Sequence, residues 1–251
     1  MDRRNRVLMP AVLIAALLVL WELLVHSLGV QPYVLPAPSA ILRALVEERA
    51  ALVSHSLVTL GETVLGLLLA AVSGMVLAIV MDAFPLFKAA IYPILVVSQT
   101  VPVIVLAPIF IIWLGFGLAP KILTVVLMCF FPIVVNFADG MGQIDRNQIN
   151  LIRSFGAGRI QEYSMVKIPA AATTLFSGLK VAATYSISGA VVGEWLSSNR
   201  GLGYYMLRVK SAYRLDRVFA CVLVVIALSL LMNGAVKLLQ YFAMPHERRA
   251  A

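Results

Sequence analysis

Six long apolar runs dominate the pattern of this chain, and short segments between them hold most of its charged residues. A helix needs about 20 apolar residues to cross the hydrocarbon core of a bilayer. Membrane-spanning strands would instead alternate apolar and polar residues over about ten positions, which these runs do not do. We therefore predict an all-α integral membrane protein that forms a single transmembrane domain over residues 1–251. Its six transmembrane helices are expected at about 7–28, 58–82, 89–113, 120–138, 169–194 and 217–242.

The composition supports this class and narrows the choice of partners. Hydrophobic residues make up 61% of the 251 residues and charged residues 13%, whereas soluble domains have roughly 45–50% and about 25%. These values exclude a soluble enzyme, a disordered chain and a fibrous repeat. The net charge is +8, and its basic residues lie between the apolar runs. We therefore expect membrane lipid, and no nucleic acid, as the partner of this charge.

The basic residues also predict the orientation of the chain. Arg3, Arg4 and Arg6 precede the first apolar run, as in a signal peptide, but no small-residue cleavage site follows. We therefore expect an uncleaved first span. Six spans place both termini on one side, and a modest excess of Lys and Arg favours the cytoplasm for that side. The segment 29–57 is then outside and the segment 139–167 inside.

Two connections are long enough to carry structure of their own. In the outer one, residues 39–53 have the pattern of a short amphipathic helix. In the inner one, residues 139–167, we predict a helix over 148–154, a break at Gly156 and a second helix over 159–167. Gly156 is well placed to end the first helix in a left-handed conformation. A helix pair of this kind is typical of a simple connector or of a docking surface, and the pattern leaves both open.

The inner connection resembles the loop signature of binding-protein-dependent ABC importer permeases. That signature is written EAA, three residues, G, nine residues and I-x-L-P, and Gly156, Val166, Ile168 and Pro169 take its last positions with the same spacing. The EAA positions hold Asn, Leu and Ile at 150–152. This departure puts the detailed contacts of the first helix in question and leaves the family assignment intact.

Other segments resemble the same family in the same order along the chain. LPAPS at 35–39 looks like a segment of the nitrate, sulfonate and taurine permease group. GLK at 178–180, Glu194 followed by GLGY at 201–204, and the stretch from Val101 to LGFG at 114–117 also match family patterns. SQTVP at 98–102 and FFP at 130–132 look most like permeases for pyrimidine thiamine precursors. The resemblance thus covers nearly the whole chain.

The resemblance implies a type I ABC importer (MetI-like) permease in the bacterial inner membrane. Its partners would be a second copy of itself, two ATP-binding subunits, and a periplasmic or lipid-anchored binding protein that delivers a small solute, either a sulfonate or taurine-like compound or a pyrimidine. The chain has no G-x-x-x-x-G-K-[ST] loop, so the ATPase would bind the ATP and Mg. The residues expected to couple to it are Ile152, Arg153, Phe155, Gly156, Ala157, Arg159 and Pro169.

Polar residues inside the runs are candidates for the translocation path, because polar groups in a bilayer usually face the bundle interior. Hydrogen bonding between helices is the alternative for each. Lys180 either reaches toward the headgroups or meets a water-filled cavity or a carboxylate. The candidates are Ser98, Gln99, Thr100, Pro102, Asn136, Lys180, Thr184, Tyr185, Ser186, Ser188 and Glu194.

Acidic and catalytic residue patterns decide among the other function classes. Glu62 and Glu194 lie toward the outer ends of their runs, and we expect both at the membrane interface. A transporter or channel driven by an ion gradient is the alternative function, and it would need several buried acidic residues. No Ser-His-Asp set, paired carboxylates or HExxH motif occurs in the sequence, so we expect no catalytic residue and no metal site.

Overall fold

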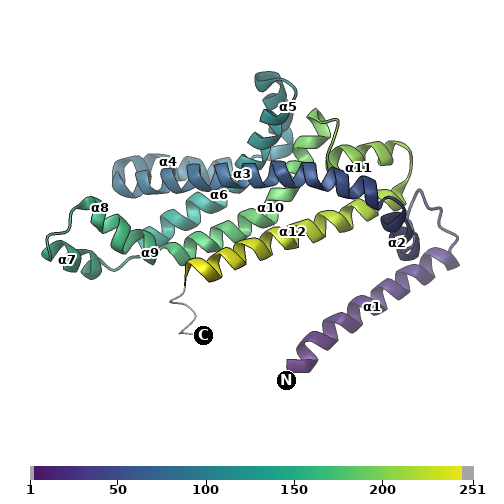
Figure 1. The fold of residues 1–251 in the computed structure, drawn as a ribbon, viewed down its shortest axis with the longest axis horizontal. Coiled ribbons are helices and arrows are strands. Elements are labelled where there is room, and N and C mark those ends of the chain that lie inside the picture. Colours follow the sequence, from purple (N-terminus) through teal and green to yellow (C-terminus); the bar gives the residue numbers. More distant parts are fainter. Residues whose placement is uncertain (1–2, 245–251) are drawn as a thin grey trace.

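The computed structural model describes residues 3–244, with side chains from residue 8 onward. The side chains of Arg3, Arg4 and Arg6 therefore lie outside the described part. All regular elements of the described residues are helices, which confirms the predicted class (Figure 1). They are α1 (Arg3–Ser27), α2 (Pro38–Glu47), α3 (Arg49–Ala83), α4 (Pro85–Ser98), α5 (Val103–Leu114), α6 (Leu118–Gly142), α7 (Arg146–Ser154), α8 (Arg159–Glu162), the π-helical turn η1 (Tyr163–Lys167), α9 (Ile168–Ala170), α10 (Ala172–Ser197), α11 (Leu202–Ser211) and α12 (Leu215–Ala243).

Five helices are long and apolar enough to cross a membrane: α1, α3, α6, α10 and α12. The third predicted span, 89–113, differs from the expectation because it is broken into α4 and α5, whose axes are bent by 104°. Pro102 explains the break, since it has no N–H to donate and it disfavours helical geometry at the preceding residue. Taken as one broken span, the pair brings the total for the described residues to six.

The second span begins earlier than predicted. The amphipathic helix expected over 39–53 ends at Glu47, and α3 begins at Arg49. Residues 49–53 therefore form the first turns of a helix of 35 residues. At about 1.5 Å per residue, α3 is longer than the hydrocarbon core is thick, so it extends beyond the bilayer.

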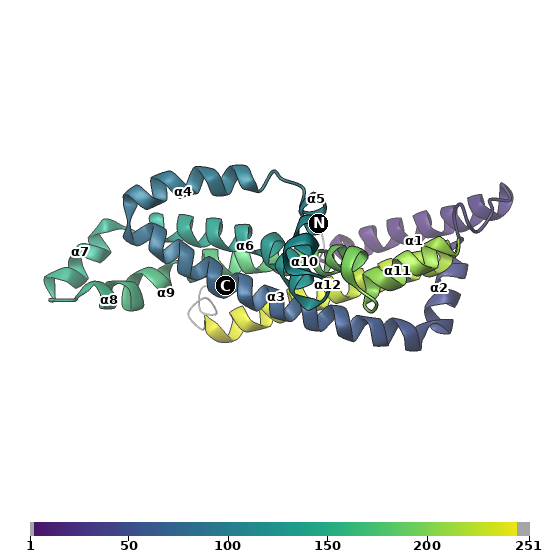
Figure 2. The ribbon, with the colours of Figure 1, turned by 90° about the horizontal axis from the view of Figure 1, so that it is seen from above.

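Small residues allow the two central helices, α6 and α10, to lie against each other (Figure 2). A Cβ atom on Gly178 would lie 2.6 Å from the carbonyl oxygen of Pro132, and one on Gly193 would lie 2.9 Å from the Cα atom of Lys121. Close backbone approach through glycine is typical of helix packing in membranes, where dispersion contacts replace the hydrophobic effect as the driving force. α3 and α12 pack on this central pair.

The first helix, α1, stands apart from the bundle and is anchored at one end (Figure 1). The carboxylate of Glu22 accepts hydrogen bonds from the Ser39 hydroxyl at 2.6 Å and the Ser39 N–H at 3.0 Å. Trp21 packs edge-on against Phe219, with ring centroids 6.0 Å apart. The remaining apolar side chains of α1 are mostly exposed, so within this chain α1 has a lateral position.

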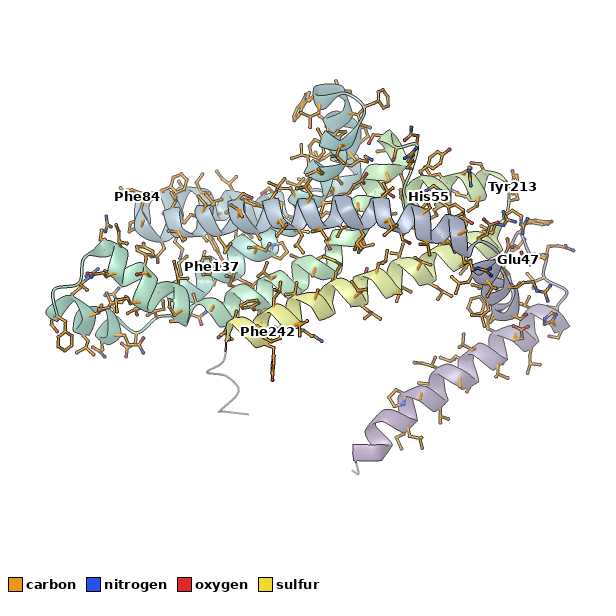
Figure 3. The ribbon with its side chains drawn as sticks, in the orientation of Figure 1. Glu47, His55, Phe84, Phe137, Tyr213 and Phe242 are labelled. Carbon is orange, nitrogen blue, oxygen red and sulfur yellow. The ribbon has the colours of Figure 1, made fainter. Side chains whose placement is uncertain are left out.

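The bundle has two distinct ends. The segment α7 to α9 lies at one end, together with Phe84 and the last turn of α12, near Phe242 (Figures 1 and 3). Glu47, His55 and Tyr213 mark the opposite end, where α2 and α11 lie (Figure 3). The segments predicted to be inside and outside are therefore at opposite ends of the spans.

Candidate functional site

The loop surface, defined here as residues 145–170, is built on α7. The Asp145 carboxylate caps this helix by accepting from the N–H of Asn147 at 2.9 Å. At the other end, Gly156 has φ +83°, the left-handed conformation expected for it. Its N–H donates to the Arg153 carbonyl at 2.9 Å, and the N–H of Ala157 donates to the Ile152 carbonyl at 3.2 Å. These bonds satisfy carbonyls that the end of a helix leaves open.

The loop surface presents large apolar side chains without covering them. Phe155 is 81% exposed and Ile160 is 85% exposed. Beside Phe155 lies an apolar groove of about 470 Å³, which continues toward the start of α10. Its lining residues are Gln148, Leu151, Ile152, Phe155, Met165, Val166, Pro169 and Ala170. Three of the residues predicted to couple to an ATPase, Ile152, Phe155 and Pro169, therefore share one groove.

A network of charged side chains ties the loop surface to the end of α3, and sequence reasoning did not find it. Arg153 donates to Glu162 Oε2 from Nε at 2.9 Å and from Nη2 at 2.7 Å. Lys167 contacts Glu162 Oε1 at 3.3 Å and Asp82 Oδ2 at 2.7 Å. The Tyr163 hydroxyl also donates to Asp82 Oδ2, at 2.7 Å. The guanidinium of Arg153 is thus occupied inside the loop.

Arg159 adds a weaker contact to the same helix end. Its guanidinium lies 3.4 Å from the Ala83 carbonyl oxygen. Together with Asp82, this contact attaches α8 and η1 to the last turn of α3. Movement of the loop surface would therefore be transmitted to α3 as well as to α6 and α10, which the chain connects directly.

The electrostatics of this network predict a dependence on pH. Burial alone would raise the pKa of the Glu162 carboxyl, but hydrogen bonds and charges from Arg153 and Lys167 outweigh it and lower that pKa below 4.5. A carboxyl with a lowered pKa in the folded state stabilises the fold above its unfolded pKa and loses this contribution as pH falls through its folded pKa. Hydrogen exchange of the loop amides, corrected for intrinsic rates, should show constant protection between about pH 5 and 8 and a loss below about 4.5. The Glu162→Gln variant should lack this step; an identical step in that variant would contradict the assignment.

A second candidate site lies at the break between α4 and α5. A pocket of about 290 Å³ there is lined by Ser98, Gln99, Val101, Val103, Leu127, Met128, Phe131, Pro132 and Tyr185. The third, fourth and fifth predicted spans all contribute to it. Of the path candidates, it brings together Ser98, Gln99 and Tyr185. Thr100 and Pro102 are exposed in the break beside these residues.

The remaining path candidates are placed elsewhere. Asn136 donates to the Pro132 carbonyl at 2.8 Å, and the buried Ser186 donates to the Ala183 carbonyl at 2.8 Å. Thr184 donates to the carbonyl of Lys180 at 3.0 Å and accepts from Asn233 of α12 at 3.0 Å. These groups satisfy helix carbonyls or join neighbouring helices, the alternative considered for them. Ser188 is exposed on α10.

Of the alternatives considered for Lys180, contact with a carboxylate is not observed among the described residues, and the two acidic residues are buried. Lys180 is half-buried, and it takes part in none of the ion pairs found within residues 3–244. Within the long helices, Lys121 of α6 meets a carboxylate, because it pairs with Glu62 of α3, and it also lies 3.3 Å from the Ser198 hydroxyl. Only 7% of Lys121 and 4% of Glu62 is exposed. Glu62 is therefore buried inside the protein.

Glu194 is likewise buried, with 1% exposed, and it holds the start of α11. Its carboxylate accepts from the Thr59 hydroxyl and from the N–H of Gly203, both at 2.6 Å. The N–H of Leu202 donates to Thr59 Oγ1 at 2.9 Å. A carboxylate at a helix N-terminus satisfies open N–H groups and interacts favourably with the helix dipole. This contact explains the role of the GLGY segment at 201–204, which begins α11 and is held in place by Glu194.

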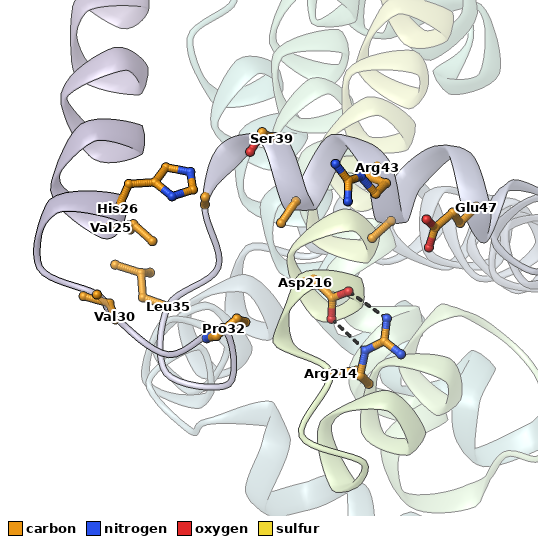
Figure 4. Close-up of a pocket in the computed structure, with 14 residues that line it drawn as sticks. Val25, His26, Val30, Pro32, Leu35, Ser39, Arg43, Glu47, Arg214 and Asp216 are labelled. Carbon is orange, nitrogen blue, oxygen red and sulfur yellow. Dashed lines mark hydrogen bonds and ion pairs between the residues drawn. The ribbon is translucent and has the colours of Figure 1, made fainter.

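The opposite end of the molecule carries a charged pocket of about 590 Å³ between the α1–α2 connection and α12 (Figure 4). Arg214 and Asp216 form a two-bonded ion pair there, at 3.2 and 3.0 Å. Arg43 and Glu47 of α2 also line it. None of these four residues was predicted as a site residue, because charged residues on short surface helices, at helix ends and in the turns beside them carry no distinctive spacing.

The sequence matches one family model and is similar to known transport permeases. The family model described as "binding-protein-dependent transport system inner membrane component" matches residues 63–241. The formylaminopyrimidine transport permease protein ThiX of Halalkalibacterium halodurans is 34% identical over 250 residues, covering 99% of this chain and 100% of that protein. The taurine transport system permease protein TauC of Escherichia coli is 26% identical over 234 residues, covering 90% and 85%.

A solved structure shares the fold. A chain of the MetNI methionine ABC transporter, in an inward-facing crystal form, superposes with a TM-score of 0.60 at 17% sequence identity. The match covers 76% of this chain and 97% of that one. This likeness confirms the MetI-like arrangement of the helices predicted from the loop signature.

Proposed function

We propose how this chain works in transport. It belongs to the family of binding-protein-dependent transport system inner membrane components and is the multi-pass permease of an ABC importer. Two copies form the path for the solute. Two ATPase subunits bind ATP and Mg and dock on the loop surfaces, and an external binding protein delivers the solute at the end of α2 and α11. The observation that carries this proposal is the uncovered apolar groove beside Phe155.

The loop surface suits the transmission of force. Its apolar side chains offer anchors for a partner, as buried aromatic and aliphatic residues do in protein interfaces. The Arg153–Glu162–Lys167–Asp82 network makes α7, η1 and the end of α3 one connected unit. When ATP closes the two ATPases, the two loop surfaces move together and the path reopens outward. When the two ATPases separate from each other again, the path opens to the inside.

The charged pocket at the opposite end supports the place given to the binding protein. Arg43, Glu47, Arg214 and Asp216 bring both signs of charge to a surface between α2 and α12. Complementary charges at an interface mainly set partner choice and the rate of encounter. A permease must distinguish its own binding protein from others, and a mixed-charge surface is suited to that task.

The orientation follows from the same proposal. The loop surface is cytoplasmic, as are both termini, and α11 is outside. Gln148 is exposed on the loop and Tyr213 is 75% exposed after α11, while the native Cys129 and Cys221 are buried. In intact cells, a membrane-impermeant thiol reagent should label Tyr213→Cys and leave Gln148→Cys unlabelled until the cells are opened. The reverse pattern would invert the topology and remove the ATPase from the loop surface.

The solute proposed is a pyrimidine of the formylaminopyrimidine type. The relative that carries this name matches this chain at 34% identity from end to end, whereas the taurine permease matches at 26%. A sulfonate such as taurine is the second candidate, favoured by the likeness to that permease.

The experiment is ATP-driven uptake in proteoliposomes. The chain is reconstituted with its partner ATPase and binding protein, with ATP supplied on the side of the loop surface. We expect accumulation of radiolabelled formylaminopyrimidine that requires ATP, the binding protein and both subunits. Uptake that runs on an ion gradient without ATP, or that persists without the ATPase, would contradict the proposed function.

A further inference from the structure

The break between α4 and α5 leaves backbone groups open inside the membrane-spanning region. Ser98 ends α4 and Val103 begins α5. The N–H groups of Thr100 and Val101 still donate to carbonyls one turn back, at 3.0 and 3.2 Å. Within residues 3–244, however, the carbonyl oxygens of Gln99, Thr100 and Val101 accept no hydrogen bond from the chain. Irregular backbone at this depth is tolerated where it is buried in protein or lines a water-filled cavity.

A pocket lies at this break. It has a volume of about 290 Å³, at the small end of ligand pockets, and suits a single ring rather than a long solute. Phe131 and Met128 of α6 supply apolar surface, and Gln99 and Tyr185 supply polar groups. The amide of Gln99 makes no hydrogen bond with the described residues and is exposed, so both its donor and its acceptor are open to a solute.

The chemistry of the pocket discriminates between solutes. No Lys, Arg, Asp or Glu lines it, and the open backbone groups are acceptors. An anion such as a sulfonate or nitrate needs N–H donors or cations around its oxygens. The open carbonyls of Gln99 and Val101, two residues that line the pocket, would repel those oxygens and would accept hydrogen bonds from amino groups instead.

We propose that this pocket is a solute site within the permease and that it selects an uncharged, nitrogen-rich aromatic ring bearing N–H donors. The ring lies against Phe131 and Met128, its N–H groups donate to the open carbonyls, and the Gln99 amide pairs with its acceptor and donor edge. The permease thus adds its own selection to that of the binding protein. This inference rests on the proposed function for its role in transport, but binding at the pocket can be measured separately.

The test is ligand binding to the full-length chain in nanodiscs, with and without the ATPase and without the binding protein. Saturation-transfer NMR compares formylaminopyrimidine with taurine as probes. We expect binding of the pyrimidine and none of taurine. Gln99→Leu should weaken pyrimidine binding about tenfold, because the bound solute would leave polar groups unpaired. The control Ser73→Ala should bind as wild type, since the Ser73 hydroxyl bonds the Leu69 carbonyl in α3, away from the pocket.

The outcomes separate this inference from the proposed function. Three results would each overturn the inference. They are binding of taurine as strong as that of the pyrimidine, unchanged pyrimidine binding in Gln99→Leu, and no pyrimidine binding to a preparation that transports it. Selective binding that depends on Gln99, in a chain that fails to support ATP-driven uptake, would support the site and overturn the proposed function.

Discussion

Replacing Lys121 with Met is expected to destabilise the folded chain by about 3–5 kcal/mol, because it leaves a buried carboxylate without its partner. Glu62 and Lys121 are both nearly inaccessible to solvent, and Glu194 lies close enough to interact with the same pair. Two buried carboxylates would then face each other without the compensating cation. The measurement is the unfolding midpoint in detergent, together with the fraction of monodisperse protein after purification.

Two control variants make this result specific. The double variant Glu62→Gln with Lys121→Met removes both charges of the pair, and the remaining Glu194 carboxylate keeps its hydrogen bonds from Thr59 and Gly203, so most of the lost stability should return. Lys237→Met removes an exposed lysine from α12 and should change the free energy of unfolding by less than about 0.5 kcal/mol. A Lys121→Met chain as stable as wild type would show that the pair is not a structural element of the bundle.

Replacing Gly156 with Val should uncouple transport while leaving the membrane domain folded. At φ +83° a β-branched residue is strained by about 1–2 kcal/mol. Within the described part of the chain, no atom other than those of the adjoining residues lies within 4 Å of the position that a Cβ would take, so the strain is conformational and is relieved when the loop surface changes shape. Strain of this size corresponds to a loss of ATPase docking of about 5- to 30-fold. Co-purification of the ATPase and ATP-driven uptake measure it.

The chain offers a matched control for Gly156. Gly29, between α1 and α2, also has a positive φ, +61°, and open space around its Cβ position. Gly29→Val therefore introduces similar strain at the opposite end and should leave ATPase docking intact. Gly156→Asn, which tolerates left-handed geometry, should be milder than Gly156→Val. Normal ATPase docking and uptake in Gly156→Val would show that the loop is only a connector, which would contradict the prediction.

The features that the sequence predicted well are those encoded by adjacent residues. Long apolar runs predict helices directly, and five of the six predicted spans are continuous helices. Gly156 was predictable because a glycine after a short amphipathic helix has few roles other than a left-handed helix end. The break in the third span was harder to place. Its signal was Pro102 inside an apolar run, and helices in membranes also tolerate proline without breaking.

The charged contacts were not predictable, because they join residues that are far apart in sequence. Glu62 and Lys121 are separated by 59 positions, and Lys167 and Asp82 by 85. Nothing local marks Lys121 as buried, since it follows a turn and flanks an apolar run, where a lysine at the interface is equally common. The Arg153–Glu162 pair spans only 9 positions. Its prediction would have required the conformation of the turn at Gly156 to Gly158, because that turn decides which side chains of α7 and α8 meet.

Cross-linking of the ATPase to the loop surface tests the central claim most directly. Phe155 is 81% exposed, and the native cysteines Cys129 and Cys221 are buried, so a cysteine at position 155 is the main reactive thiol on that surface. With the ATPase present, a short bifunctional thiol–amine reagent should join Phe155→Cys to the ATPase in high yield and should not join Tyr213→Cys, at the opposite end, to it. A Phe155→Cys chain that never cross-links while Tyr213→Cys does would contradict the account, because the ATPase would then dock on the wrong end of the bundle.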